Sequence, residues 1–110
     1  MLPFDVEVLE YLNREGRSPY ARWFDSLHAQ AAAKVAIAIT RLARGNFSNV
    51  KPVGSGVMEY KIDFGPGYRI YLGKDGERIV ILLGGGTKSR QQSDIRTAQD
   101  RWVDYKQRKK

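Results

Sequence analysis

The sequence contains no cysteine and only one histidine, His28. The lack of cysteine excludes disulfide bonds and thiolate metal sites, and a single histidine excludes a histidine-rich metal cluster or a catalytic pair of histidines. No apolar run approaches the roughly 18 residues that a membrane span requires. We therefore expect a function that needs no metal, no other cofactor and no membrane.

The length of 110 residues is typical of one domain, and 42% of the residues are hydrophobic, enough for a core of its own. No repeat, low-complexity segment or linker interrupts the chain, so we expect one domain over residues 1–110. The first ten residues carry acidic side chains where a secretory signal would carry basic ones. The chain is therefore expected to be a cytoplasmic protein.

Positive charge is in excess, with a net charge of +7, and it is unevenly distributed. Residues 57–110 contain twelve lysines and arginines against seven acidic residues, whereas residues 1–56 contain seven against five. Such a balance favours nucleic acid or an acidic protein as the partner, although it also serves solubility alone.

Strict alternation of apolar and polar side chains marks residues 58–64 as a strand, and residues 68–72 alternate in the same way. Gly65-Pro66-Gly67 reverses the chain between them, since glycine permits positive φ angles and proline fixes its own. If the apolar faces pack together, the opposite faces form one exposed surface. That surface carries Glu59, Lys61, Arg69 and Tyr71.

The amino-terminal half predicts one strand and two helices. Phe4, Val6 and Val8 alternate with acidic residues, as in a first strand. Ser18-Pro19 is a helix start, because serine caps and proline suits the first helical position. A second helix follows His28 and ends at Gly45, a residue suited to a left-handed cap. Residues 46–56 are expected to be a connection.

The carboxyl-terminal half predicts a third strand and a last helix. Asp75-Gly76 suits a two-residue hairpin turn, and the apolar run 79–83 suits a central strand buried on both faces. Residues 84–86, three glycines, are expected to form a flexible exit. Residues 89–92 fit a capping box that opens the last helix. The order is β-α-α-β-β-β-α, with an antiparallel meander, and the fold class is α+β.

Several segments together resemble the HigB-like branch of the RelE/ParE toxins, which are also called addiction module killer proteins and occur in phages. They are residues 57–63, the Gly-Pro-Gly-Tyr-Arg-Ile-Tyr of 65–71, the Gly-Gly-Gly-Thr-Lys of 84–88, and Gln92, Asp94-Ile95, Ala98 and Trp102. The resemblance runs from Trp23 to Trp102. It implies a small α+β toxin with a RelE-like fold.

The resemblance also implies an activity and a partner. Such toxins usually cleave mRNA on the translating ribosome, and a cognate antitoxin, in this branch usually a helix-turn-helix DNA-binding protein, holds them inactive. RNA can be cut without a metal when its own 2′-hydroxyl attacks the neighbouring phosphate. That reaction needs a base, a cation for the phosphorane and an acid for the leaving oxygen.

Arg69 and Lys88 are the candidates for holding the phosphate. Arg69 matches the strand arginine to which the superfamily assigns phosphate stabilisation, and its fork can bind two phosphate oxygens. The alternative is a solvated arginine paired with Glu59 or Asp63. Lys88 matches the family's Gly-Gly-x-Lys position beside the last helix. The alternative is a loop lysine in water.

Lys61, Glu59 and Tyr71 are the candidates for proton transfer and base contact. Either Lys61 or Glu59 could act as the base. A lysine must be neutral to accept a proton, and neighbouring cations would favour its neutral form by lowering its pKa. The alternative for these two residues is an ordinary ion pair. Tyr71 could stack on an RNA base or donate to the leaving oxygen, or it could merely cover the sheet.

Three further cations, Lys51, Arg90 and Arg96, are expected to contact phosphates. The resemblance is incomplete at one place, because several RelE-type ribonucleases carry a histidine or tyrosine after their last strand as the general acid. Residues 84–88 hold no such group, which leaves Lys88 as the acid or makes this chain a weaker nuclease.

We therefore predict a toxin of a type II toxin–antitoxin system that is a metal-independent mRNA endoribonuclease and inhibits translation. One alternative is a ParE-like poison of DNA gyrase, which has no need of phosphodiester-binding residues. Another is a phage-derived homologue without toxicity.

Overall fold

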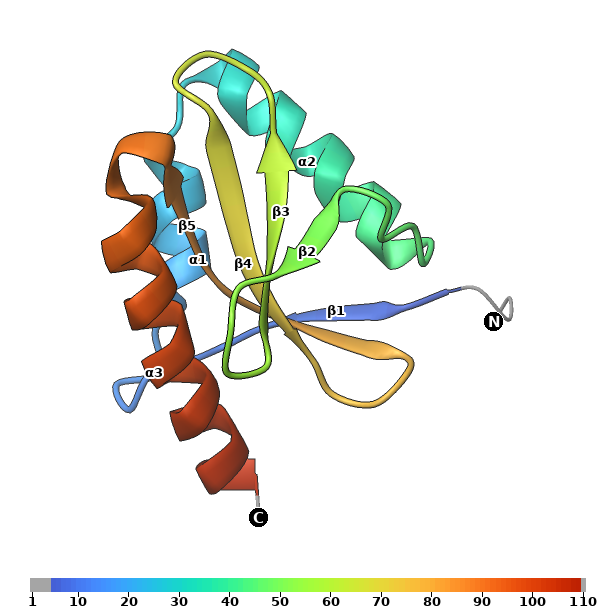
Figure 1. Ribbon diagram of the computed structural model, residues 1–110, viewed down its shortest axis with the longest axis vertical. Helices are drawn as coiled ribbons and strands as arrows, with labels where there is room; N and C mark the ends of the chain where they lie inside the picture. The colour runs from blue at the N-terminus through green and yellow to red at the C-terminus, as the bar shows by residue number, and fades with distance from the viewer. Residues whose placement is uncertain (1–4, 110) are drawn as a thin grey trace.

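One five-stranded sheet with helices on both faces forms the protein in the computed structural model, which describes residues 5–109 (Figure 1). The order of strands in the sheet is β1-β5-β4-β3-β2. Strands β3, β4 and β5 form an antiparallel meander, and β1 pairs with β5 in parallel. The strands are β1 (Glu7–Glu10), β2 (Val50–Pro52), β3 (Val57–Ile62), β4 (Tyr68–Lys74) and β5 (Ile79–Thr87).

The helices divide between the two faces of the sheet, with α1 and α2 behind it and α3 in front in Figure 1. Their bounds are α1 (Pro19–Asp25), α2 (Ala29–Ala43) and α3 (Gln91–Lys109). A short 3₁₀ helix, η1 (Lys88–Arg90), joins β5 to α3. The structure is thus of the expected α+β class, with an antiparallel meander at its centre.

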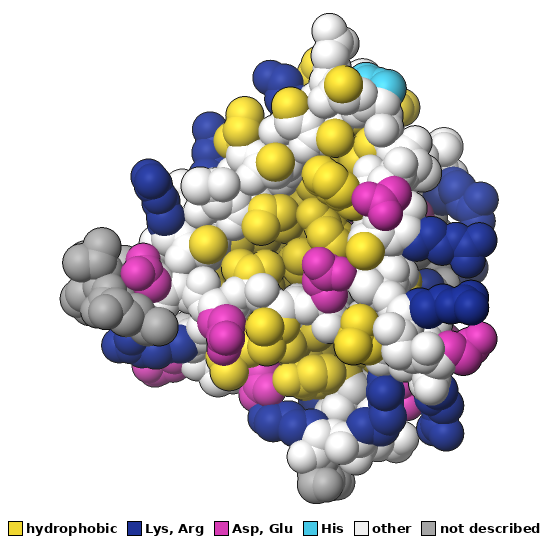
Figure 2. Space-filling view, turned by 180° about the vertical axis from the view of Figure 1, so that it is seen from behind, with side chains coloured by type: hydrophobic (Ala, Val, Ile, Leu, Met, Phe, Trp, Pro, Cys, Tyr) yellow, Lys and Arg dark blue, Asp and Glu magenta, His cyan; other side chains and the backbone are white. Residues whose placement is uncertain are grey.

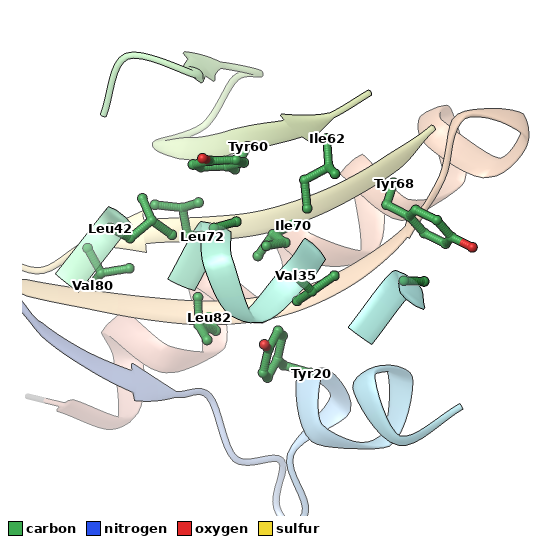
Figure 3. Close-up of a cluster of buried hydrophobic side chains, with 12 residues drawn as sticks. Tyr20, Val35, Leu42, Tyr60, Ile62, Tyr68, Ile70, Leu72, Val80 and Leu82 are labelled. Carbon is green, nitrogen blue, oxygen red and sulfur yellow. The ribbon is translucent and has the colours of Figure 1, made fainter. Parts of the chain in front are cut away.

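The larger core lies between the sheet and helices α1 and α2. Figure 3 shows Val35 and Leu42 of α2 packed against Ile70, Leu72 and Val80 of the sheet. The apolar alternation of both predicted strands is confirmed, because Tyr60 and Ile62 of β3 and Tyr68, Ile70 and Leu72 of β4 all belong to this core. A smaller core around Tyr71, Ile81 and Trp102 lies beneath α3.

Several local predictions are confirmed at single residues. The Ser18 hydroxyl accepts a hydrogen bond from the Ala21 amide at 3.0 Å, with Pro19 as the first helical residue. His28 caps α2 through its Nδ1, which accepts from the Ala31 amide. Gly45 has φ +81° just after α2, as a left-handed cap requires.

Other predictions about the connections are wrong. Residues 46–56 contain the additional edge strand β2, which pairs with β3. Four residues, 75–78, separate β4 from β5, where a two-residue turn was expected. The capping box does not form: η1 precedes α3, and its N-cap Thr87 makes no side-chain capping bond. The predicted first strand begins at Glu7 in the structure, and Phe4 lies outside the described residues.

The three glycines Gly84, Gly85 and Gly86 are part of strand β5, which corrects the prediction of a flexible exit. Each lies opposite a β4 residue, and each has a side chain packed where its own Cβ would be. Arg101 covers Gly84, the Trp23 indole covers Gly85, and a carboxylate oxygen of Asp94 would lie 1.9 Å from a Cβ on Gly86. Glycine is needed here for close approach, because α1 and α3 both pack on this segment.

The face that carries α1 and α2 is apolar at its centre, and its lysines and arginines lie mostly toward the edges (Figure 2). A hollow of about 450 Å³ on this face is lined mainly by apolar side chains, among them Val8, Phe24 and Ile39. Positive charge is not concentrated there, so this face is the less suited of the two to bind a polyanion.

Candidate functional site

The four polar side chains of β3 and β4 lie on one face of the sheet, as predicted. Glu59 is opposite Tyr71, and Lys61 is opposite Arg69. Strand β2 adds Lys51, which lies opposite Glu59. Cross-strand partners are about 5 Å apart, so their side chains form one cluster beneath the amino-terminal end of α3.

The expectation that this surface is exposed is wrong for three of the four residues. Glu59 is 0% exposed, Arg69 4% and Tyr71 1%, whereas Lys61 is exposed. The first turn of α3 covers the cluster, and the Gln91 amide nitrogen donates a 2.9 Å hydrogen bond to Glu59 Oε2. The sequence pattern placed the residues on the correct face but did not indicate that α3 lies over it.

Glu59 is a buried anion between two cations. Its Oε1 lies 3.7 Å from Arg69 Nε and 3.9 Å from the Lys51 ammonium. The Arg69 guanidinium also donates through one terminal nitrogen to the Gly67 carbonyl at 3.2 Å. The ion pair that was weighed as the alternative role of Arg69 is therefore present with Glu59. Asp63 pairs with Lys61 instead, at 3.5 Å.

Three cations meet at the turn between β3 and β4. Lys61, Arg69 and Lys88 line one open hollow of about 310 Å³ together with residues of that turn. The Lys88 amide donates a 2.9 Å hydrogen bond to the Gly67 carbonyl, which fixes η1 against the turn. Two flexible ammonium groups around one guanidinium form an arrangement that can bind a phosphate group.

Four buried side-chain atoms within residues 5–109 have no hydrogen-bond partner, and all four lie under the start of α3. They are Glu59 Oε1, Arg69 Nε, Tyr71 Oη and Asp94 Oδ2. Asp94 belongs to the site through Gly86, on which its carboxylate rests. Polar atoms left unpaired in a folded protein usually mark a bound water, a ligand or a catalytic role.

Burial changes the protonation of two of these groups. It raises the pKa of Tyr71, with further contributions from the nearby carboxylates of Glu59 and Asp94, so the phenol stays protonated at neutral pH. Burial also raises the pKa of Asp94, against the lowering effect of Arg90 and Arg101. Both groups lie close enough to interact electrostatically.

The other predicted residues occupy different places. Arg90, in η1, lines a separate and larger groove between α1 and α3. Arg96 is exposed on α3 and lines neither hollow. Sequence reasoning did not include Gln91 or Asp94 in the site, although the glycine opposite Arg69 was a signal that a side chain from elsewhere lies there.

Within residues 5–109, no three histidine, cysteine, aspartate or glutamate side chains are grouped so that they could hold a metal ion. The helices in that range also include none with the length and apolar character needed to span a membrane.

Comparison with known proteins finds a relative by sequence and neighbours by structure. No family model matches the chain. A protein of Haemophilus influenzae, described as uncharacterized, is 46% identical over 77 residues, which cover 69% of this chain and 78% of the relative.

One structural neighbour is a chain of the toxin–antitoxin complex RelBE2 from Mycobacterium tuberculosis. It superimposes with a TM-score of 0.52 at 16% identity, covering 80% of this chain and 97% of the neighbour. At this identity the likeness establishes the fold, which is that of a RelE-like toxin. By its sequence, the chain belongs to the same family as the Haemophilus influenzae protein.

Proposed function

We propose that this protein is the toxin of a type II toxin–antitoxin system and that it cleaves mRNA on the ribosome. The observation that carries the proposal is the hollow shared by Lys61, Arg69 and Lys88, with Glu59 and Tyr71 beside it. The RelE-like fold and the resemblance to HigB-like toxins support it further.

The proposed reaction uses the RNA's own nucleophile. The 2′-oxygen attacks the adjacent phosphorus and gives its proton to a base. The bond from phosphorus to the 5′-oxygen then breaks, and that oxygen takes a proton from an acid. The products are a 2′,3′-cyclic phosphate and a 5′-hydroxyl end. Cations that hold the nonbridging oxygens stabilise the charge of the phosphorane.

The geometry favours particular residues for each role. Arg69 and Lys88 hold the phosphate, since both line the hollow. Lys61 is better placed than Glu59 as the base, because Lys61 reaches the solvent and Glu59 is 0% exposed. Glu59 instead orients Arg69 through their ion pair. Lys88 is better placed than Tyr71 to give the proton to the leaving oxygen, because Lys88 lines the hollow and Tyr71 lines the separate groove between α1 and α3.

The remaining cations and the partners complete the proposal. Lys51, Arg90 and Arg96 are exposed and would contact the RNA backbone without reading its sequence. The partners are mRNA on the ribosome and a helix-turn-helix antitoxin, and the place of action is the cytoplasm.

One observation favours a second function. Arg69 and Tyr71 are almost fully buried, so fewer groups that could act on a phosphodiester reach the surface than the sequence predicts. A toxin that binds a protein target, as ParE-like poisons bind DNA gyrase, would not need these groups to be accessible. A homologue without toxicity is a third outcome of the same experiment.

A translation extract programmed with a reporter mRNA tests the proposal. Wild-type protein should produce fragments with 2′,3′-cyclic phosphate and 5′-hydroxyl ends. Lys61→Ala and Lys88→Ala should each cut at least 10-fold more slowly. Arg41→Ala, which removes one exposed charge from α2, is the matched control and should cut at the wild-type rate. Intact mRNA in the presence of wild-type protein would refute the nuclease assignment.

A further inference from the structure

A second groove, of about 1130 Å³, lies between α1 and α3 and is distinct from the hollow at the β3–β4 turn. Strand β1 pairs with β5 only as far as Leu82, so the following part of β5 is a free sheet edge. The groove runs along that edge past Gly84 and Gly85. In Figure 1, α1 and α3 lie on opposite sides of β5 there.

Four arginines line this groove, two from each side. Arg17 and Arg22 come from the region of α1, and Arg90 and Arg101 from η1 and α3. In the described part of the chain, Arg101 donates to the Leu83 carbonyl at 2.8 Å, and the other three guanidiniums form no ion pair. Unpaired guanidiniums on both walls suit an anionic ligand.

The floor of the groove is different in character. Tyr71, which is 1% exposed, and Asp94 both line it, and Tyr71 Oη and Asp94 Oδ2 have no hydrogen-bond partner. The half-buried Trp23 indole lies on Gly85, on the face of β5 opposite to Tyr71 and Asp94, and lines the same groove at the sheet edge. The Asp94 carboxylate, as a lining group of the groove, can accept an N–H donor from a ligand, and a phosphate cannot supply one.

We propose that this groove binds a nucleotide of the RNA strand next to the one held at the Lys61–Arg69–Lys88 hollow, an inference that rests on the proposed function. A nucleotide has both kinds of group that the groove requires: a phosphate for the arginines and a base with N–H donors for Asp94. Trp23 offers an aromatic surface for the base. Arg90 and Lys88 are two residues apart in η1, so one strand can reach both hollows.

An acidic peptide is the competing ligand. It would satisfy the arginines, and Asp94, Glu15 and Asp25 would repel its carboxylates as they repel a phosphate, so charge does not separate the two ligands. A nucleotide differs in bringing the N–H donors of a base to Asp94 and a flat ring to Trp23. If a nucleotide binds here, Asp94 should therefore strengthen RNA binding, although its negative charge repels a polyanion. Electrostatic interaction between charges alone predicts that Asp94 weakens binding.

The test measures anisotropy of labelled hexamers binding to the full chain. The probes are 2′-O-methyl adenine RNA, which cannot be cleaved through its 2′-oxygen, the same backbone without bases, and a hexaglutamate peptide. Asp94→Ala should weaken binding of the adenine hexamer about 10-fold and should not weaken the abasic hexamer. The matched control Asp100→Ala removes one exposed charge from the same helix and should not weaken either RNA.

A second pair of variants tests the walls. Arg17→Ala/Arg22→Ala should weaken both RNA hexamers about 10-fold, beyond any change in the control Arg41→Ala/Arg44→Ala, which removes the same charge from the end of α2. Equal losses in both pairs, or tighter adenine binding by Asp94→Ala, would overturn the proposal. A groove-dependent preference for hexaglutamate over RNA would also overturn it.

The proposed function can fail separately. If wild-type protein cleaves mRNA but the groove variants bind RNA like wild type, only the groove assignment is wrong. If the groove variants behave as expected but no mRNA is cleaved, the nuclease assignment is wrong and the groove is a nucleotide site of another function. Thermal melts of each variant confirm that the folded protein is being compared.

Discussion

The two ends of helix α3 rest on the same face of the sheet but make opposite kinds of contact. At the carboxyl-terminal end, Trp102 packs flat against Gly73, and the Tyr105 hydroxyl donates to Asp75 at 2.7 Å. Tyr11 donates to Asp104 at 2.7 Å in the same region. At the amino-terminal end, four buried polar atoms of the described residues lack hydrogen bonds, and two of them, Glu59 Oε1 and Arg69 Nε, face each other in an ion pair at 3.7 Å.

This difference separates stability from function. Paired polar groups around an aromatic core cost little to bury and hold the helix in place. Unpaired polar groups cost free energy, and such a cost is common where a site awaits a ligand. We therefore infer that the carboxyl-terminal end of α3, at Trp102, stabilises its packing and call it the anchor end. The amino-terminal end, at Gln91 and Asp94, belongs to the functional site, and we call it the working end.

The largest effect is expected from Arg69→Ala. It should lower the free energy of unfolding by about 3–5 kcal/mol, because Glu59 is left as a poorly compensated buried charge. mRNA cleavage should fall about 10²- to 10³-fold, as when one stabiliser of a transition state is removed. Chemical denaturation and cleavage assays measure the two effects separately.

A second substitution separates these effects. Glu59→Gln in the Arg69→Ala background should restore much of the stability but not the cleavage. Arg69→Lys should recover activity only in part, because an ammonium group cannot bind two phosphate oxygens side by side. Full activity in the Arg69→Ala/Glu59→Gln protein would remove Arg69 from the site.

Trp102→Ala tests the anchor end. It should cost about 3–5 kcal/mol of stability through the loss of a large buried aromatic side chain. Trp102→Phe should cost less. At low temperature, the folded fraction of Trp102→Phe should cleave mRNA at the wild-type rate. A large loss of cleavage rate without a loss of stability would contradict the division of α3 into a stabilising end and a functional end.

Gln91→Ala should have a smaller effect at the working end. It removes the hydrogen bond to Glu59 Oε2 and should lower stability by about 1–3 kcal/mol, as expected when a buried charged acceptor loses its donor. The melting temperature measures this. An unchanged melting temperature would show that the first turn of α3 does not close over Glu59 in solution.

The pH dependence of stability should differ in sign between the two ends. Hydrogen bonds from Lys109 and Tyr105 hold the pKa of Asp75 below its ordinary value, so this carboxylate stabilises the fold above about pH 4. Asp75→Asn should therefore be less stable than wild type at neutral pH, and the difference should close as pH falls through the lowered pKa. Thermal melts across this range measure it.

Asp94→Asn should behave in the opposite way. Burial raises the pKa of Asp94, so the wild-type carboxyl favours the folded state at low pH and loses that contribution as pH rises through the raised value. The variant should gain stability over wild type above that pH. If Asp94→Asn were less stable than wild type at neutral pH, ionised Asp94 would not destabilise the folded protein, which would contradict the prediction.

The sequence predicted the hairpin of β3 and β4 well because the alternation of apolar and polar residues follows directly from which face of a strand packs on the core. The same pattern gave the correct face for Glu59, Lys61, Arg69 and Tyr71. It could not show that Glu59, Arg69 and Tyr71 are covered, since a polar face beneath a helix and one in water have the same alternation. The cover over Glu59 includes Gln91 of α3, which is distant in the chain.

The glycines of β5 show a second limit. Gly84–Gly86 suggested a flexible segment because glycine has no side-chain preference of its own. In the structure they belong to strand β5, Gly84 with a φ of +153° beside a shift in register, and their missing Cβ atoms admit Arg101, Trp23 and Asp94. Only knowledge of what packs on a glycine distinguishes these two roles, and that knowledge comes from tertiary contacts.

The central claim is that this protein cuts mRNA at the Lys61–Arg69–Lys88 hollow. Mapping mRNA 5′ ends in cells after induced expression of the wild type, Lys61→Ala and Lys88→Ala tests it most directly. We predict growth arrest with new 5′-hydroxyl ends for the wild type and far fewer ends for both variants. Growth arrest with intact mRNA in wild-type cells would contradict the claim and favour a protein target such as gyrase.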